Sequence, residues 1–159
     1  DSDPEFFIDT AADNTLRRSR LRENDILFVI AGATIGKVAK MEPLLLPANV
    51  NQAISFLRPN FLIVPSYLHY VLDSSIVTEV IQLLMVQAAQ PNISMANLGN
   101  IEFPMPPKTE QATIVEFLDA KCTETDALIA EKQRSVETMR QYKRSLIYEY
   151  VTGKKRVAS

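Results

Sequence analysis

The sequence predicts an α+β protein, in which a mixed α/β domain is followed by a long C-terminal coiled-coil helix. Three observations support this fold class. Short β-prone runs separated by turn residues lie between residues 26 and 57. Apolar residues at helical spacing follow between residues 66 and 85. Finally, ten positions between residues 118 and 150 succeed one another at alternating steps of four and three, which is the spacing of a coiled-coil seam.

The strands are expected in the first half of the chain. Residues 26–30 form a continuous β-prone run that reads as a buried strand, and the turn 31–34 leads into a second strand at 35–39. A third strand is expected at 53–57, closed by the turn residues that follow it.

Helices are expected next. Pro65 opens the first of them with Ser66 as its N-cap, residues 73–75 interrupt it, and residues 76–85 form a second helix. The polar segment 87–94, which contains a proline, is expected to be a loop.

A proline-rich segment marks the predicted domain boundary. Residues 101–103 read as a short strand that runs into the prolines of 104–107, which cannot donate ladder hydrogen bonds. The long helix is expected from about Thr109 to the stop at Thr152 and Gly153. The predicted organisation is therefore a mixed α/β domain at 1–107, a long helix at 108–153 and a basic tail at 154–159.

The coiled-coil seam predicts a partner helix. Its ten positions, seven of them apolar, are Leu118, Cys122, Thr125, Ile129, Lys132, Val136, Met139, Lys143, Leu146 and Tyr150. A seam of this length needs a second helix of matching length, and no other segment of the sequence is long enough to supply one. We therefore expect helix pairing through Leu118, Ile129, Val136, Met139 and Leu146.

Composition limits the class of partner and the compartment. The formal charge of −2 does not indicate a strong nucleic-acid binder, although residues 14–107 carry seven bases against six acids, so a small phosphate-facing surface fits. The single Cys122 fits a reducing compartment. The longest uncharged apolar run, 26–36, is too short to span a bilayer, and no signal pattern opens the chain. We expect a soluble, cytoplasmic protein.

No catalytic, cofactor or metal site is predicted. Residues 32–38 resemble a phosphate-binding loop but have three residues between the glycines instead of four, and Val38 stands where a hydroxyl would hold Mg²⁺. His69 is the only histidine, so a metal site would lack a second histidine ligand. A Ser/His/Asp triad would have to use this same residue, and no nucleophile-elbow pattern is present. A partly buried structural histidine is the better interpretation.

Basic and amide side chains are the candidates for binding. Arg18 and Arg20 belong to a basic cluster suited to phosphate, and Lys37 lies near the first turn. Amides in predicted loops are able to read base edges: Asn49, Asn51, Gln52, Gln90 and Asn92. The structural alternative for each amide is turn formation, which favours Asn for conformational reasons.

An ordered set of short phrases resembles the specificity subunits of type I restriction–modification systems. These phrases are NDILF at 24–28, AGATIGKV at 31–38, NVNQA at 49–53, QPNIS at 90–94, FPMPP at 103–107 with EQ at 110–111, KRSLI at 143–147 and VTGK at 151–154. The resemblance runs from about Leu21 to the C-terminus.

The resemblance implies a function. In such subunits a target-recognition domain reads one half of a split site in double-stranded DNA, and a conserved long helix follows it. Two domains and two antiparallel helices normally make the full subunit. The methyltransferase subunit docks on this frame, and a restriction subunit joins for cleavage. The expected protein is therefore a non-catalytic specificity subunit, with self-association or a second half-subunit supplying the missing helix.

This chain departs from the family pattern in three ways. It holds one recognition unit without its usual N-terminal portion, as a fragment, a half-length subunit or a shuffled subunit would. Residues 87–89 replace the usual Gly and Ser or Thr before the QPNIS phrase, and Val29 and Ile30 stand where many relatives have an arginine. The alternative function, favoured by the acidic pI of about 5.5, is a protein-interaction module that oligomerises through its coiled coil without binding DNA.

Overall fold

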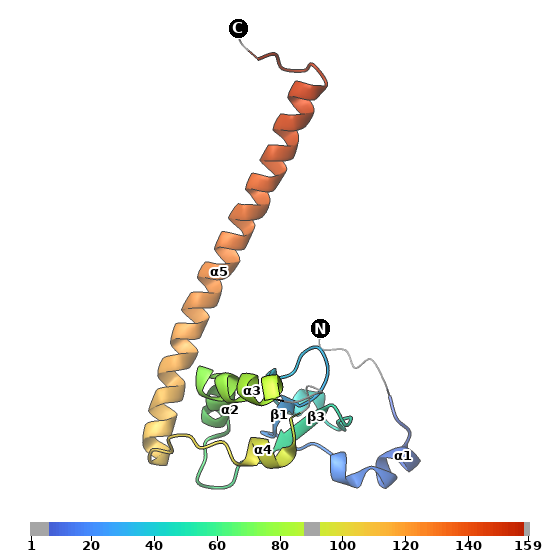
Figure 1. The fold of residues 1–159 in the computed structure, drawn as a ribbon, viewed down its shortest axis with the longest axis vertical. Coiled ribbons are helices and arrows are strands. Elements are labelled where there is room, and N and C mark those ends of the chain that lie inside the picture. Colours follow the sequence, from blue (N-terminus) through green and yellow to red (C-terminus); the bar gives the residue numbers. More distant parts are fainter. Residues whose placement is uncertain (1–6, 88–92, 158–159) are drawn as a thin grey trace. The chain divides into compact units, whose positions relative to one another are not determined.

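The computed structural model describes residues 7–87 and 93–157. Contacts divide the chain into two compact units, Asp1–Val115 and Glu116–Ser159, which are described separately. The described residues contain a three-stranded sheet, several short helices and one long helix (Figure 1). The predicted α+β class with a long C-terminal helix is confirmed. No helix in the described ranges is long and apolar enough to cross a membrane.

The sheet is antiparallel throughout and has the strand order β2-β1-β3. The central strand β1 spans Ile26–Val29, and β2 (Val38–Lys40) and β3 (Ile54–Leu57) pair with it on either side. All three strands fall where the sequence predicts strands, but β2 begins three residues later than expected. Residues 32–36 form a bend and a turn instead, because Gly32 and Gly36 adopt the positive φ angles 95° and 88° that end extended structure.

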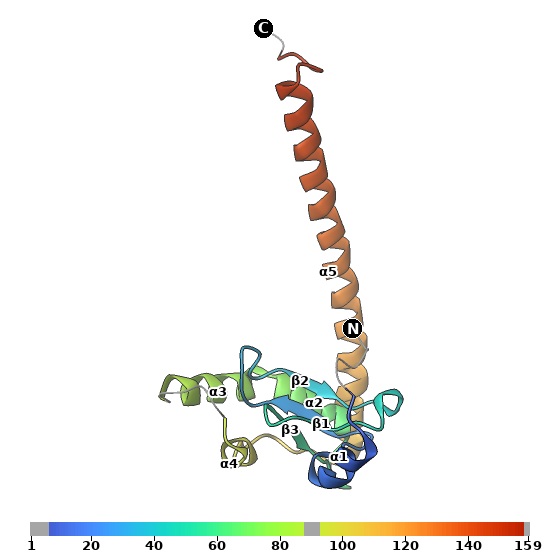
Figure 2. The same ribbon diagram turned by 90° about the vertical axis from the view of Figure 1, so that its right-hand side faces the viewer.

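Helices α2 (Pro65–Asp73) and α3 (Ser75–Gln87) follow the sheet in the chain (Figure 2). The break between them falls at Ser74, as the sequence predicts. They bury apolar side chains against the central strand, and α4 (Met95–Gly99) adds one more. The core consists of Ile26, Phe28, Leu68, Leu72, Val77, Ile81, Ile93 and Leu98. The alternation of buried and half-buried residues along β1 therefore directs Ile26 and Phe28 into this core.

Two short helices were not predicted. α1 (Thr10–Thr15) begins at Asp9, whose carboxylate accepts a hydrogen bond from Ala12 N–H. α4 begins at Ser94, whose hydroxyl accepts from Asn97 N–H in the same way. Two short 3-10 turns, η1 (Arg17–Ser19) and η2 (Pro43–Leu45), complete the described elements. Helices this short carry too little apolar periodicity to be found by pattern, so their capping residues were the only available signal.

The predicted strand at 101–103 is wrong, because these residues have no regular secondary structure. Ile101 and Phe103 pack partly buried against the core without a partner strand. The backbone that follows is held by side chains instead. The Tyr67 hydroxyl donates to the carbonyl of Pro104 at 2.8 Å, and the Gln111 amide donates to the carbonyl of Pro106 at 2.9 Å.

The predicted N-cap at Ser66 is also wrong. The N-cap residue of α2 is Val64, with Pro65 in the first turn. No side chain of α2 itself caps the helix, and the Val64 N–H donates to Oε1 of Gln111 at 2.8 Å. Ser66 instead accepts a hydrogen bond from Nζ of Lys40 at 3.0 Å.

The long helix α5 spans Lys108–Val151, 44 residues, which corresponds to a length of about 66 Å. Its first turns belong to the first compact unit and the remainder to the second. The helix ends where the sequence predicts, since Gly153 adopts a φ of 76° and Lys155 N–H returns to the carbonyl of Glu149. The Lys155 ammonium also pairs with the Glu149 carboxylate at 2.7 Å, which raises the pKa of Lys155 above its ordinary value.

Candidate nucleic-acid interface

The antiparallel sheet brings two sequence-distant loops to one end. The last residues of β1 lie beside the first residues of both β2 and β3, because both neighbours run in the opposite direction. Backbone hydrogen bonds fix this end, with Val29 N–H on the Lys37 carbonyl at 3.0 Å and Ile30 N–H on the Ala53 carbonyl at 2.8 Å. The turn containing Lys37 and the loop containing Asn51 and Gln52 therefore share one end of the sheet.

The basic segment, residues 17–22 with Arg18 and Arg20, reaches the same end by a second antiparallel pairing. Arg20 forms an isolated bridge with Asn49, and hydrogen bonds on either side join residues 19–21 to residues 48–50. Arg18 lies just before this bridge, in the 3-10 turn η1, and lines the same groove as Asn51. Ile93 also joins this end, since its N–H donates to the carbonyl of Ile30 at 3.0 Å.

An open groove lies where these segments meet. Its polar lining includes Arg18, Asn51 and Gln52, three of the residues singled out in the sequence. Its apolar lining includes Ile54 and Phe56 of β3 and Met95 of α4. Arg18 and the two amides come from separate segments, η1 and the loop before β3, so this juxtaposition was not readable from spacing along the chain. A groove lined by apolar side chains together with a cation and two amides suits a flat ligand with polar edges, such as a base pair.

The side chains of Arg20 and Asn49 form hydrogen bonds within the fold. Arg20 donates to both carboxylate oxygens of Asp13, at 2.9 and 2.6 Å. The Asn49 amide donates to Asp13 and accepts from the hydroxyl of Ser19. The Arg20 guanidinium, followed by the Asn49 amide, holds the pKa of the Asp13 carboxyl below its ordinary value. We therefore infer that these two residues hold α1 and the basic segment against the loop at 48–50.

The remaining candidates differ in how much of each side chain is free. Asn51 accepts a hydrogen bond from Ala53 N–H at 2.9 Å, an Asx turn that occupies its amide oxygen. By contrast, the side chains of Arg18, Lys37 and Gln52 are exposed and make no hydrogen bond or ion pair among the described residues. Gln90 and Asn92 lie outside the described residues.

An ion pair between a buried carboxylate and a partly exposed arginine lies next to the groove residue Phe56 and was missed in the sequence. Asp25 is fully buried and accepts from Nε and one terminal nitrogen of Arg58, both at 2.7 Å, and from Arg22 N–H at 2.7 Å. The carboxylate raises the pKa of Arg58 above its ordinary value. The Arg58 guanidinium also lies 5.1 Å from the ring centroid of Phe56, which lines the groove. The signal available was position, since Asp25 precedes β1 and Arg58 follows β3 at facing ends of paired strands.

The structure places the predicted pairing residues on the second compact unit. Ile129, Val136 and Met139 of α5 are exposed, while Leu118 and Leu146 are half-buried. His69 is half-buried and packs edge-on against the Tyr70 ring. No group of metal-binding side chains occurs among the described residues.

The fold and the groove define a class of protein: a small α+β domain with an open, largely apolar groove at one end of its sheet, continuing into a long helix with an apolar stripe. Residues 14–138 match the family described as type I restriction modification DNA specificity domain. This match covers most of the chain, so the chain belongs to the type I restriction–modification specificity family. The resemblance read from the ordered phrases is thereby confirmed.

Individual relatives agree with this assignment. The chain is 30% identical over 118 residues to the type I restriction enzyme EcoBI specificity subunit of Escherichia coli, covering 74% of this chain and 24% of that protein. It also resembles a chain from a structural study of complex assembly and conformational transition of the type I R-M system, with a TM-score of 0.64 and 20% identity over 80% of this chain and 34% of that one. The chain thus spans about a quarter of the length of its curated relative. Specificity subunits are the non-catalytic DNA-recognition component of restriction–modification systems.

Proposed function

We propose that this chain reads one half of a bipartite site in double-stranded DNA and docks a methyltransferase subunit, with a restriction subunit joining for cleavage. The observation that carries the proposal is the groove in a domain of this family, where Arg18 and Gln52 offer free side chains among apolar lining residues. Gln52 is the base reader in this proposal. Its unused amide presents one donor and one acceptor, the pair that matches the N6 and N7 edge of adenine.

Arg18 and Lys37 are assigned to phosphate. Both are exposed cations without a partner among the described residues. Phosphate contacts position a protein on DNA and carry no sequence information, whereas a bidentate amide contact distinguishes one base pair from another. Asn51 supports the loop that presents Gln52, because its turn fixes the backbone at Ala53.

Two substitutions separate these roles in DNA titrations across salt concentrations. Arg18→Ala is expected to weaken binding to every sequence alike and to reduce the salt slope by about one. Gln52→Ala is expected to relax preference at one or two base pairs, by about 1–3 kcal/mol, with the salt slope unchanged. The matched controls are Arg22→Ala and Gln82→Ala, two exposed residues that do not line the groove. Equal effects of Arg18→Ala and Arg22→Ala would contradict the phosphate role of the groove.

The helix is proposed to pair with another helix of its kind. The exposed apolar side chains of the second compact unit motivate this, Met139 among them with 70% of its surface exposed. Placing Glu at both Val136 and Met139 is expected to convert the chain to a monomer in analytical ultracentrifugation, because two carboxylates would have to be buried in the seam. Glu at Thr138 and Gln141, exposed positions off the seam, is the control. A wild-type chain that is monomeric at tens of micromolar with its helix intact would contradict the pairing.

A further inference from the structure

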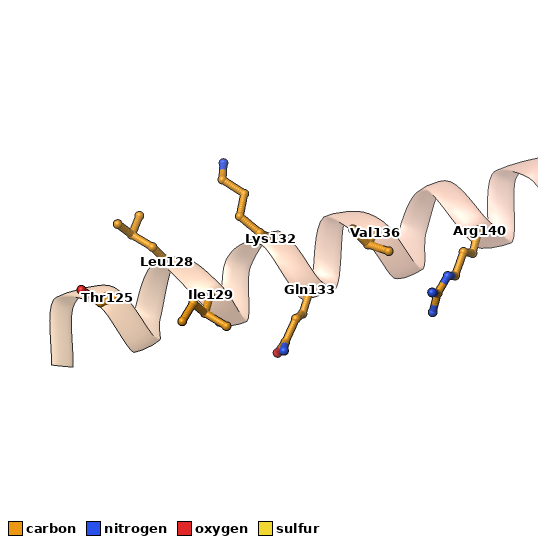
Figure 3. A pocket seen from close by; sticks show the side chains of 7 residues that line it. All are labelled: Thr125, Leu128, Ile129, Lys132, Gln133, Val136 and Arg140. Atoms are coloured by element: carbon orange, nitrogen blue, oxygen red, sulfur yellow. The ribbon is translucent and has the colours of Figure 1, made fainter. Parts of the chain in front are cut away.

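Apolar side chains line hollows in both compact units. The hollow of the second unit lies along α5, where Figure 3 shows Ile129 and Val136 set among polar neighbours. These two residues belong to the seam whose pairing is proposed above. The hollow of the first unit is the groove at the end of the sheet. There Arg18 and Gln52 have proposed DNA contacts, whereas the apolar side chains beside them have none.

The apolar lining of the groove comes from several segments of the chain. It consists of Ile30, Val50, Ile54, Phe56 and Met95. Met95 is the first residue of α4 and has 55% of its surface exposed, while the other four are half-buried. An occupant of the groove therefore meets an apolar surface as well as a cation and two amides, and Met95 is the most accessible part of that surface.

Specific contacts hold two of these apolar side chains in place. The Ser55 hydroxyl donates a hydrogen bond to Sδ of Met95, which fixes the thioether although methionine is ordinarily a flexible side chain. The Arg58 guanidinium lies 5.1 Å from the centroid of the Phe56 ring and is itself held by Asp25. Side chains that are ordered before a ligand arrives lose little entropy on binding, which favours this lining as a binding surface.

The major-groove edge of an A·T base pair matches this combination of side chains. Adenine presents the N6 donor and the N7 acceptor, and its thymine presents O4 and the 5-methyl group. The methyl group is the apolar feature of that edge, and apolar protein side chains contact it. The free amide of Gln52 suits the adenine half of the pair, and the apolar lining suits the thymine half.

We propose that Met95 contacts the 5-methyl group of a thymine, and that this thymine pairs with the adenine read by Gln52. The inference rests on the DNA reading proposed above and adds a second determinant of specificity on the same base pair. Two separate side chains then recognise the two halves of the pair, so the methyl contact is measurable apart from the amide contact.

Removing one methyl group from the DNA tests this contact. The probe is the duplex motif enriched by the chain assembled with its methyltransferase subunit, with each thymine replaced in turn by deoxyuridine. This replacement removes the 5-methyl group and keeps the hydrogen-bonding groups of the base pair. One position is expected to lose about fourfold in affinity, the effect of leaving one methyl group unburied. That position is expected to be the A·T pair at which Gln52→Ala relaxes preference.

Substitution of Met95 assigns the effect to a side chain. Met95→Ala is expected to reduce the fourfold preference for thymine over deoxyuridine to less than about twofold, because the methyl group then loses its main contact. Met95→Leu keeps an apolar side chain of similar volume and is expected to retain the preference. Met105→Ala is the matched control, since Met105 is also 55% exposed and does not line the groove. The ratio of the two affinities is measured on one protein, so a general loss of folding or binding cancels.

The outcomes separate this inference from the proposed function. An enriched motif in which no deoxyuridine replacement changes the affinity overturns the methyl contact and leaves DNA reading intact. A methyl effect that Met95→Ala leaves unchanged, or that falls on a base pair other than the one relaxed by Gln52→Ala, also overturns the inference, because the methyl group is then read elsewhere. An assembled wild-type complex that enriches no motif overturns the DNA reading and the methyl contact together.

Discussion

Replacing Arg58 with alanine is expected to destabilise the recognition domain by about 2–3 kcal/mol. The Asp25 carboxylate that it pairs with is fully buried, and two of the hydrogen bonds it accepts come from Arg58. Removing the arginine leaves a buried charge with only the Arg22 N–H as donor among the described residues. The expected loss lies below the full range for buried pairs because the Arg58 side chain itself is 37% exposed and partly solvated.

Urea unfolding of the full chain, followed by the far-ultraviolet circular dichroism, measures this loss. Arg58→Lys is expected to be intermediate, since an ammonium keeps the charge but not the two parallel hydrogen bonds. Asp25→Asn combined with Arg58→Met is expected to recover part of the loss, because the unpaired charge is then gone. An Arg58→Ala protein within about 0.5 kcal/mol of wild type would show that Asp25 is neutralised in another way.

Gln111→Glu is expected to cost about 2–4 kcal/mol at neutral pH. Gln111 is fully buried at the start of α5, and its amide nitrogen donates to the carbonyls of Leu62 and Pro106 at 3.1 and 2.9 Å. A carboxylate oxygen in that place would face two carbonyl oxygens without a proton between them. The variant also tests how the first turn of the helix is held to the loop that precedes α2.

The pH dependence of this variant follows from the same contact. Burial and the two carbonyls favour the protonated acid, so the folded pKa of the new side chain is raised above its unfolded value of about 4.3. The stability of the variant is therefore expected to be highest below that value and to fall as the pH rises through the folded pKa. Gln141→Glu, the same change at an exposed position of α5, is the control and is expected to shift stability by less than about 0.5 kcal/mol.

Sequence periodicity was sufficient for the elements that bury apolar side chains. The central strand at residues 26–29 and the long helix at 108–151 appear within a residue or two of their predicted bounds, because each depends on a run long enough to show its period. The segment at 101–103 has the composition of a strand, yet its apolar side chains are packed against the core without a partner strand. Hydrogen bonds from Tyr67 and Gln111 hold the backbone that follows it. Long-range side-chain contacts of this kind leave no local pattern.

The residue types of the candidate site could be predicted from the sequence. Which of these side chains remain free of hydrogen bonds within the fold could not be predicted. Arg18 and Arg20 look alike in the sequence, but the fold pairs Arg20 with Asp13 and leaves Arg18 at the groove. Asn51 and Gln52 are adjacent amides, and only the turn geometry shows that the oxygen of Asn51 is occupied. Which polar groups remain free depends on partners that are distant in the chain. The structural and the DNA-binding candidates can therefore be told apart only from the three-dimensional structure.

Selection from a randomised duplex pool tests the central proposal most directly. The chain assembled with its methyltransferase subunit is expected to enrich one defined motif. The same assembly carrying Gln52→Ala is expected to lose preference at one or two base pairs of that motif, while Gln82→Ala keeps it. An assembled wild-type complex that enriches no sequence would contradict DNA reading by this domain and would leave a protein-interaction module with a pairing helix as the function of the chain.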